Sequence, residues 1–330
     1  MTGIQRYPDF ESAYLEQLFD IYKNPQFINS PRGNKSKETL SVSYCIENPR
    51  ERLVRCKARK YNLVFNFAEV LWYLAASSEL AHMAFYGPLM SKFSADGQRL
   101  QGTAYGPRIF FAGPAQVNQW TNVVRTLRAD PDSKRALIQI FAAEELIDVS
   151  SIDVACTVGL QYFIREGKVH STGFMRANDA FRGCVSDVFA FTFLHELMAC
   201  DLGLELGEYA HMVSSYHIYD YDTPRVVAML EDPSRIDDAT PFPKMPSGDN
   251  WPHIRAVIAH ERALRLAHVS MTAADIERLP LPAYLQHVVC LFAIHAERHH
   301  AKRIDREKLA LLPACFARSL ENLYRAELAR

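Results

Sequence analysis

Strand-like and helix-like segments follow one another along the chain up to residue 231, and two of the helices are apolar on nearly every side. These helices, 66–77 and 185–201, have no polar face to turn to water, so the fold must bury them. Strands are predicted at 136–142, 158–164, 168–175 and 210–219. The second and third of these form a hairpin around Glu166-Gly167. The pattern therefore predicts a mixed α/β body with helices packed against a sheet.

Shorter signals complete this body. A helix is predicted at 12–22, and residues 30–40 are predicted to be a polar loop because they carry glycine, proline and charged residues. Residues 87–108 are rich in loop signals. A further helix is expected to start at Pro114, with one apolar face made of Val117, Trp120, Val124 and Leu127. The apolar helix 185–201 is expected to close near Gly203, and Thr223-Pro224 to open another helix.

The chain changes character after residue 231. Residues 232–252 contain five prolines and no periodicity, which indicates a loop or linker. Beyond it only helices are predicted, at 253–268, 273–279, 282–302 and 306–328. We therefore expect three parts: a catalytic body at 1–231, a Pro-rich linker at 232–252 and a helical C-terminal region at 253–330. The apolar faces of the late helices must pack on the body or on a second subunit.

The composition excludes several classes of protein. The 330 residues are 48% hydrophobic and 23% charged with a net charge of -1, which indicates no nucleic-acid or membrane partner. The N-terminus lacks the basic and apolar regions of a signal peptide, and no stretch is expected to span a membrane. Seven scattered cysteines include no C-x-x-C pair, which favours free thiols in a reducing cytoplasm.

Cys156 is the candidate nucleophile. A thiolate is a soft nucleophile that suits conjugate addition to the 6-position of a pyrimidine, whereas a serine would be too hard and too basic. Such a cysteine needs nearby cations to lower its pKa, and Arg176 lies on a strand expected beside it. A single cysteine in an apolar segment is usually a packing residue, so Cys156 gains meaning only from the residues that follow it.

The ordered motifs around Cys156 resemble those of the thymidylate synthase and pyrimidine hydroxymethylase family. Gln161 follows the cysteine by five residues, as in the family, and Arg176-Ala177-Asn178-Asp179 resembles its Arg-Ser-x-Asp segment. Asp187 stands where the family has a helix-opening asparagine, and His217-Ile218-Tyr219 resembles its His-x-Tyr pair. Upstream, DPDSKRALIQIF resembles the Asp-Ser-Arg-Arg strand entry, AEVLWYL resembles the Glu-Leu-Leu-Trp helix, and Arg32-Gly33 resembles the Arg-Thr-Gly phosphate loop. The resemblance covers roughly residues 20–220.

The resemblance implies an α+β, thymidylate synthase-like fold, with a mixed sheet packed with helices and an extra helical C-terminal region. It also implies a phosphate site made of basic residues, since guanidinium groups bind phosphate oxygens in pairs: Arg32, Lys134, Arg135 and Arg176. Lys134 stands where the family has an arginine. In the family this basic pair reaches across from the other subunit, so a homodimer is implied.

Further roles follow from the same resemblance. His217 and Tyr219 would bind the sugar, Gln161 would contact the substrate, and Glu69 would manage water and protons near C5. Residues expected to contact the folate co-substrate, 5,10-methylenetetrahydrofolate, are Asp179, Trp72 and Tyr105. No metal is needed for this chemistry. Isolated basic, histidine or tyrosine residues would more often be surface charges or packing residues.

Asp187 predicts a cytosine base. An asparagine suits uracil, because its amide donates to O4 and accepts from N3–H, whereas a carboxyl group accepts from N4–H and, when protonated, donates to N3. Leaving such buried groups unpaired costs about 1–3 kcal/mol each. The alternative is that Asp187 only caps a helix beside Ser186. Ala177 replaces the family's serine, and we hypothesise that this space, together with Lys134, admits a 2′-hydroxyl.

The predicted activity is therefore CMP 5-hydroxymethylation, of the type found in peptidyl-nucleoside antibiotic pathways. Ala155 and Thr157 replace the family's proline and histidine around the nucleophile. Rival interpretations are a dCMP hydroxymethylase, a thymidylate synthase acting on dUMP, and a non-catalytic nucleotide-binding protein. His295, His299 and His300 near the end of a predicted helix are compatible with a metal site, but such a cluster is more often a solvated helix end. His195-Glu196 begins a zinc-protease motif whose second histidine is missing.

Overall fold

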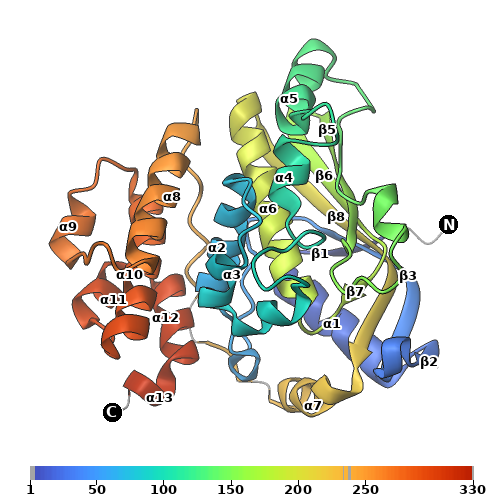
Figure 1. The fold of residues 1–330 in the computed structure, drawn as a ribbon, viewed down its shortest axis with the longest axis horizontal. Coiled ribbons are helices and arrows are strands. Elements are labelled where there is room, and N and C mark those ends of the chain that lie inside the picture. Colours follow the sequence, from blue (N-terminus) through green and yellow to red (C-terminus); the bar gives the residue numbers. More distant parts are fainter. Residues whose placement is uncertain (1–3, 233, 237–238, 329–330) are drawn as a thin grey trace.

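A computed structural model describes residues 4–232, 234–236 and 239–328. Residues 1–3, 233, 237–238 and 329–330, which belong to the predicted body, linker and C-terminal region, lie outside the described residues. Within the described part, eight strands form one sheet in the order β1-β3-β8-β6-β5-β4, with β2 beside β3 and β7 beside β8 (Figure 1). The strands are β1 (Gln5–Tyr7), β2 (Phe27–Asn29), β3 (Ser36–Ile46), β4 (Leu137–Gln139), β5 (Thr157–Arg165), β6 (Lys168–Met175), β7 (Asn178–Asp179) and β8 (Glu205–Tyr219).

The helices of the body surround this sheet. They are α1 (Phe10–Lys23), α2 (Leu63–Leu74), α3 (Leu80–Tyr86), α4 (Tyr105–Phe110), α5 (Gln119–Ala129), α6 (Gly183–Leu202) and α7 (Thr223–Glu231). The C-terminal helices are α8 (Trp251–Arg265), α9 (Ala273–Glu277), α10 (Ala283–Ala301), α11 (Arg306–Leu311), α12 (Ala314–Leu323) and α13 (Arg325–Leu328). The sheet mixes antiparallel pairs such as β3–β8 with three parallel pairs, β1–β3, β6–β8 and β7–β8. The predicted α+β class, a mixed sheet packed with helices, is confirmed.

The layers build outward from the sheet. Helix α6 packs on β6 and β8, α2 packs on α6, and α10 packs on α2, so that the C-terminal helices lie farthest from the sheet, at the left of Figure 1. By length and hydropathy α6, which covers the apolar helix predicted at 185–201, could cross a membrane, whereas no such stretch was expected from the sequence. However, 78% of its most apolar window is buried inside the protein, as expected for the core helix of the fold.

The C-terminal helices share the hydrophobic core of the body. Phe316 of α12 lies against Phe67 of α2, with ring centroids 5.7 Å apart. Phe242, in the Pro-rich segment between α7 and α8, lies 5.2 Å from the Phe316 ring and is buried. The Pro-rich segment is thus packed against the protein at this point, because an apolar side chain there is removed from water.

Three predicted elements are wrong in part. Residues 36–40 belong to β3 rather than to a loop, because Ser36–Leu40 pair with β8 across the sheet. The helix expected from Pro114 begins at Gln119, where the Asn118 side chain accepts a hydrogen bond from the Thr121 amide and caps it. The helix expected at 306–328 is divided into α11, α12 and α13, since Pro313 cannot continue a helix and instead precedes α12.

Two turns follow the sequence signals closely. Glu166 and Gly167, with φ of 50° and 72°, join β5 to β6 as predicted. Gly203 adopts a left-handed φ of 69° and ends α6, also as predicted. Between these turns the chain runs from β6 through β7 into α6. Because β7 pairs with β8, the segment after β6 lies between the sheet and α6.

Candidate active site

Cys156 lies directly before β5 and is half-buried. The neighbouring segment holds it from two sides, because the Arg176 backbone N–H donates to the Cys156 carbonyl at 2.8 Å. The Arg176 side chain donates from Nε to the Ala155 carbonyl at 2.7 Å and from Nη2 to the Val154 carbonyl at 3.1 Å. Arg176 Nη2 then lies 4.0 Å from the Cys156 Sγ. The predicted pair is therefore brought together.

A carboxylate that sequence reasoning missed anchors the same segment. Glu145 accepts the Ala155 backbone N–H through Oε2 at 2.6 Å and the Ala142 N–H through Oε1 at 3.0 Å. It also forms an ion pair with Arg108. No sequence signal marks Glu145, because it lies ten residues before Ala155 in a short 3₁₀ turn and meets that residue only in the folded chain.

The charge state of Cys156 differs from the expectation. Burial raises the pKa of the Cys156 thiol to about 11, while Arg176 and Arg32 act in the opposite direction. Asp187 and Asp179 raise the pKa further, because negative charge nearby disfavours the thiolate. The prediction that cations lower this pKa overall is wrong for the free protein, although Arg176 contributes in the predicted sense.

Asp187 lies in the first third of α6, where its carboxyl group faces Asn178. The Asn178 side-chain amide donates to Asp187 Oδ2 at 2.7 Å. Helix α6 starts at Gly183, with Arg182 at the N-cap position, so the alternative that Asp187 is merely a cap is excluded. Burial, together with the charge of Asp179, raises the pKa of Asp187 to about 7, and the bond from Asn178 lowers it.

Glu69 and two tyrosines form the wall next to Asp187. Burial raises the pKa of Glu69 to about 8; the charge of Asp187 adds to this and a hydrogen bond with Tyr73 opposes it. Within the described part of the chain, Glu69 Oε2 is buried without a hydrogen-bond partner. Tyr105 stacks on Tyr73 with ring centroids 5.1 Å apart. Burial, then the charges of Asp187 and Cys156, raise the pKa of Tyr105.

Asp179 and His217 are opposite each other in the β7–β8 pair. Asp179 Oδ1 accepts the backbone N–H groups of Phe181 and Arg182 at 2.9 and 2.8 Å. Burial raises the pKa of Asp179, and His217 acts in the opposite direction. The rings of His217 and Tyr219 meet edge to face at 4.9 Å.

Arg32 extends the site beyond β8. It lies in a tight turn with a left-handed φ of 50° and is exposed. Its charge acts on both Tyr219 and Cys156, lowering the pKa of each against the larger effect of burial. Arg32 is therefore close to the predicted sugar-binding and nucleophilic residues, as the resemblance implied.

The remaining residues predicted for the site do not join the side chains around Cys156 within a single chain. Lys134 and Arg135 are exposed before β4 at the sheet edge, and the Gln161 side chain donates to the Lys134 carbonyl at 2.8 Å. Ala177 is half-buried between Arg176 and Asn178. Trp72 is 0% exposed within the core, and its contact with a folate stays a prediction.

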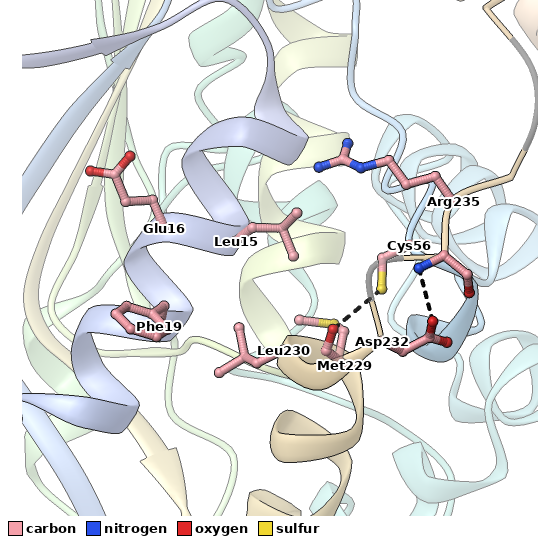
Figure 2. A pocket seen from close by; sticks show the side chains of 9 residues that line it. Leu15, Glu16, Phe19, Cys56, Met229, Leu230, Asp232 and Arg235 are labelled. Atoms are coloured by element: carbon pink, nitrogen blue, oxygen red, sulfur yellow. Dashed lines mark hydrogen bonds between the residues drawn. The ribbon is translucent and has the colours of Figure 1, made fainter.

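Two further places in the molecule are separate from Cys156. A cleft of about 360 Å³ lies between α1 and α7, lined by residues that include Leu15, Cys56 and Arg235 but none of the predicted site residues. Figure 2 shows the side chains that line it. No group of three or more His, Cys, Asp or Glu among the described residues could hold a metal ion. His295, one of the three histidines considered as metal ligands, forms a hydrogen bond through Nδ1 with the Tyr324 hydroxyl at 2.9 Å.

The fold and the site define an α+β protein with a cysteine–arginine centre bordered by buried carboxyl groups. The family model described as thymidylate synthase matches residues 12–253, well over half of the chain. The chain belongs to the thymidylate synthase family. The match ends near the start of α8, so most of the C-terminal helical region lies beyond it.

Three phage proteins are similar to this chain, each named a deoxyuridylate hydroxymethyltransferase. The protein of Bacillus phage SP01 is 30% identical over 216 residues, which cover 62% of this chain and 56% of that protein. The protein of Delftia phage PhiW-14 is 31% identical over 200 residues, covering 57% and 54%. The protein of Pseudomonas phage M6 is 25% identical over 214 residues, covering 60% and 59%. The chain thus spans little more than half the length of these relatives.

Proposed function

We propose that this protein transfers a one-carbon unit from 5,10-methylenetetrahydrofolate to C5 of a cytosine nucleotide and hydrates it, giving 5-hydroxymethyl-CMP. Membership of the thymidylate synthase family and the names of the phage relatives support one-carbon transfer to a pyrimidine nucleotide. A reducing compartment such as the cytoplasm is part of this proposal, because the seven scattered cysteines include no C-x-x-C pair.

The residues around Cys156 fit a folate. Asp179 uses Oδ1 for two backbone donors, and no hydrogen bond to its Oδ2 occurs among the described residues, which leaves an acceptor for a pterin N–H. The stacked pair of Tyr73 and Tyr105 provides an aromatic wall of the kind on which a flat heterocycle packs. Bound 5,10-methylenetetrahydrofolate would supply the one-carbon unit at the oxidation level of formaldehyde.

Three residues of the chain itself carry out the other steps of the proposed reaction. The Cys156 thiolate adds to C6 of the base, which makes C5 nucleophilic, and leaves again when the product forms. Arg176, at 4.0 Å, stabilises that thiolate and presents its guanidinium group to the nucleotide phosphate. Glu69 Oε2 has no hydrogen-bond partner among the described residues, and the pKa of Glu69 is about 8, so it can give or take a proton near neutral pH and orients the water that is added.

The observation that carries the choice of cytosine is the half-buried carboxyl group of Asp187 beside the nucleophile. Its charge acts directly on the Cys156 thiol. With a pKa raised to about 7, Asp187 exists in both protonation states near neutral pH. The ionised form accepts from the cytosine N4–H, and the protonated form donates to N3, so either form pairs with cytosine.

A second candidate is hydroxymethylation of dUMP, which the names of the three phage relatives favour. The two candidates differ in the base and in the sugar but share Cys156 and the one-carbon donor. The similarity to the CMP 5-hydroxymethylase of the mildiomycin pathway, and with it a role in nucleoside-antibiotic formation, stays a prediction based on Asp187, Ala177 and Lys134.

We also propose that the protein works as a homodimer. Lys134 and Arg135 are exposed at the sheet edge, whereas the other two predicted phosphate contacts, Arg32 and Arg176, act on Cys156. A second subunit would supply the missing pair. Large apolar side chains exposed on the strands support a covered sheet face: Leu40, Leu137, Val158 and Met212.

The test is a competition experiment. The protein is incubated with 5,10-methylenetetrahydrofolate and equal amounts of CMP, dCMP, UMP and dUMP, and the products are identified by mass spectrometry. We expect a hydroxymethyl group on CMP, and Asp187→Asn should lower turnover of CMP at least tenfold and gain turnover of a uracil nucleotide, because one unpaired buried donor costs about 1–3 kcal/mol. Hydroxymethyl-dUMP from the unaltered protein would select the second candidate, and a methyl group on dUMP would identify a thymidylate synthase.

A further inference from the structure

A chain of three hydrogen bonds extends from Asp187 into the core. The Asn178 amide donates to Asp187 Oδ2 at 2.7 Å, and Asn178 Oδ1 lies 3.0 Å from Nε2 of His211. His211 Nδ1 in turn lies 2.8 Å from the Tyr209 hydroxyl. Asn178 is 2% exposed, and His211 and Tyr209 are both 0% exposed. Apart from Asp187 itself, this relay is shut off from solvent.

With the Asn178 amide oriented as it is in the structure, the chemistry of the groups sets the direction of every bond. An amide nitrogen can only donate, so with Nδ2 on Asp187 the Asn178 oxygen must accept from His211. Nε2 of His211 therefore carries a proton. Burial lowers the pKa of His211 to about 3, so the ring is neutral and has only that one proton. Nδ1 of His211 then carries no proton, so it accepts a hydrogen bond from the Tyr209 hydroxyl.

The direction of the relay limits what Asp187 can do. Since Asn178 donates to Oδ2, that oxygen already accepts one hydrogen bond inside the protein. Within the described part of the chain no hydrogen bond to the other oxygen, Oδ1, occurs. The carbonyl-type oxygen of a carboxyl group is the better acceptor, so this bond favours Oδ1 as the oxygen that carries the proton when Asp187 is protonated.

We propose that Asn178 and His211 are positioning residues that fix Oδ2 of Asp187 as an acceptor and present Oδ1 to the pyrimidine ring. This inference rests on the proposed function for the identity of the ring, but the hydrogen-bond order itself does not. His211 contacts no reacting atom; it acts by holding the Asn178 amide in one orientation. Without His211, either end of the amide could face Asp187, and both the proton's place and the base preference would be lost.

A purely structural role explains the relay less well. Three polar side chains are placed in a core layer where apolar residues would avoid the cost of desolvation, about 1–3 kcal/mol for each group that loses its partner. The neighbours of His211 on the same face of β8, Tyr209 and Val213, are buried as it is. A buried chain of hydrogen bonds with a set direction has a use at this position only if the orientation of the Asn178 amide affects Asp187.

Other groups act on the charge of Asp187 and bear on any titration. Asp179 raises its pKa from the β7 side, and electrostatic coupling joins it to groups on the surrounding elements: Glu69, Tyr73, Tyr105, Cys156, Cys184 and Tyr209. None of these except Tyr209 is bonded to the relay. Variants of His211 therefore leave those couplings in place and change only the bond from Asn178.

The test measures the Asp187 pKa directly, without substrate. Protein labelled with ¹³C at the aspartate carboxyl carbon is titrated by NMR, and the Asp187 signal is identified by its absence in Asp187→Asn. We expect His211→Phe to raise the pKa by about one unit, a roughly tenfold change in the protonation equilibrium, because the carboxylate loses a fixed donor. His211→Gln, which keeps an N–H that can reach Asn178, should shift it by less than half as much.

Tyr209→Phe serves as the milder variant if His211→Phe does not fold, which circular dichroism reveals. It should move the pKa in the same direction by a smaller amount. An Asp187 pKa that is unchanged in the folded variants, or raised equally by His211→Gln and His211→Phe, would overturn the inference. The pH profile of kcat/KM for CMP should shift by the same amount as the NMR value.

The two hypotheses can fail separately. A shifted Asp187 pKa in protein that modifies no pyrimidine nucleotide would keep the positioning role and reject the proposed function. Conversely, normal hydroxymethylation by wild-type and variant proteins with an unmoved Asp187 pKa would keep the proposed function and reject the positioning role.

Discussion

Arg176 holds Cys156 through its backbone and approaches it with its side chain. Its N–H donates to the Cys156 carbonyl at 2.8 Å, and its Nη2 lies 4.0 Å from Sγ. The same guanidinium group donates to the carbonyls of Ala155 and Val154, so its position is set by the loop that carries the nucleophile. One residue thus links the shape of this loop to the charge of the thiol.

The first prediction concerns the reactivity of Cys156. Arg176→Ala should raise the pKa of the thiol above its present value of about 11 and slow alkylation by iodoacetamide at pH 8.5 by about tenfold, since each pKa unit is a tenfold change in thiolate. Peptide mass mapping follows the labelling of Cys156 alone. Arg278→Ala, at an exposed arginine in the C-terminal region, is the control and should leave the rate unchanged. Equal rates in both variants would contradict the role of Arg176.

The second prediction concerns pH and stability. The folded protein holds the Glu69 proton up to a pKa of about 8, whereas the unfolded chain releases it near the ordinary value of 4.5. The folded state therefore binds more protons between these values, and stability falls as pH rises through this window, by at most about 1.4 kcal/mol per pH unit from this group. Glu69→Gln should flatten this decline. Urea unfolding at pH 5 and pH 8 measures it, and parallel losses in the two proteins would refute the prediction.

The third prediction concerns the loop before the nucleophile. Glu145→Ala removes the acceptor of the Ala155 and Ala142 N–H groups and the partner of Arg108, so we expect a loss of about 1–3 kcal/mol in the free energy of unfolding. Turnover should also fall, because the Cys156 loop is less fixed. The matched control is Glu144→Ala, an exposed neighbour in the same turn. If both variants were equally stable and active, Glu145 would not be the anchor.

The fourth prediction concerns the proposed homodimer. Val158 is 43% exposed on β5, and Val158→Lys places a charge on the apolar sheet face. We expect light scattering after size-exclusion chromatography to show the monomer mass for this variant and twice that mass for the parent protein. Val269→Lys, at a valine of the same 43% exposure between α8 and α9, should stay dimeric. A monomeric parent protein would reject the proposal that Lys134 and Arg135 serve a second subunit.

The fifth prediction concerns the sugar. Ala177 lies between Arg176 and Asn178, next to the residue predicted to bind phosphate. Ala177→Ser should shift the ratio of kcat/KM for CMP over dCMP toward dCMP by several-fold, because the added hydroxyl fills space near the 2′ position and gives a donor. Steady-state rates with both nucleotides provide the ratio. A ratio identical to that of the parent protein would count against the proposed role of Ala177.

The sequence was sufficient for the class of fold and for predicting that Cys156 and Arg176 lie together, because strand alternation, apolar helices and spaced motifs are properties of the chain itself. It was not sufficient for β3, whose polar residues Ser36–Leu40 read as a loop until β8 pairs with them.

Only the tertiary structure decided the chemistry of the site. The pKa of Cys156 depends on burial as well as on Arg176, and the state of Asp187 depends on Asn178 and His211, which are 9 and 24 residues away from it in the sequence. Glu145 becomes an anchor only when its turn meets Ala155. Desolvation and hydrogen-bond direction arise from packing between distant segments, so no local pattern of residues could have shown them.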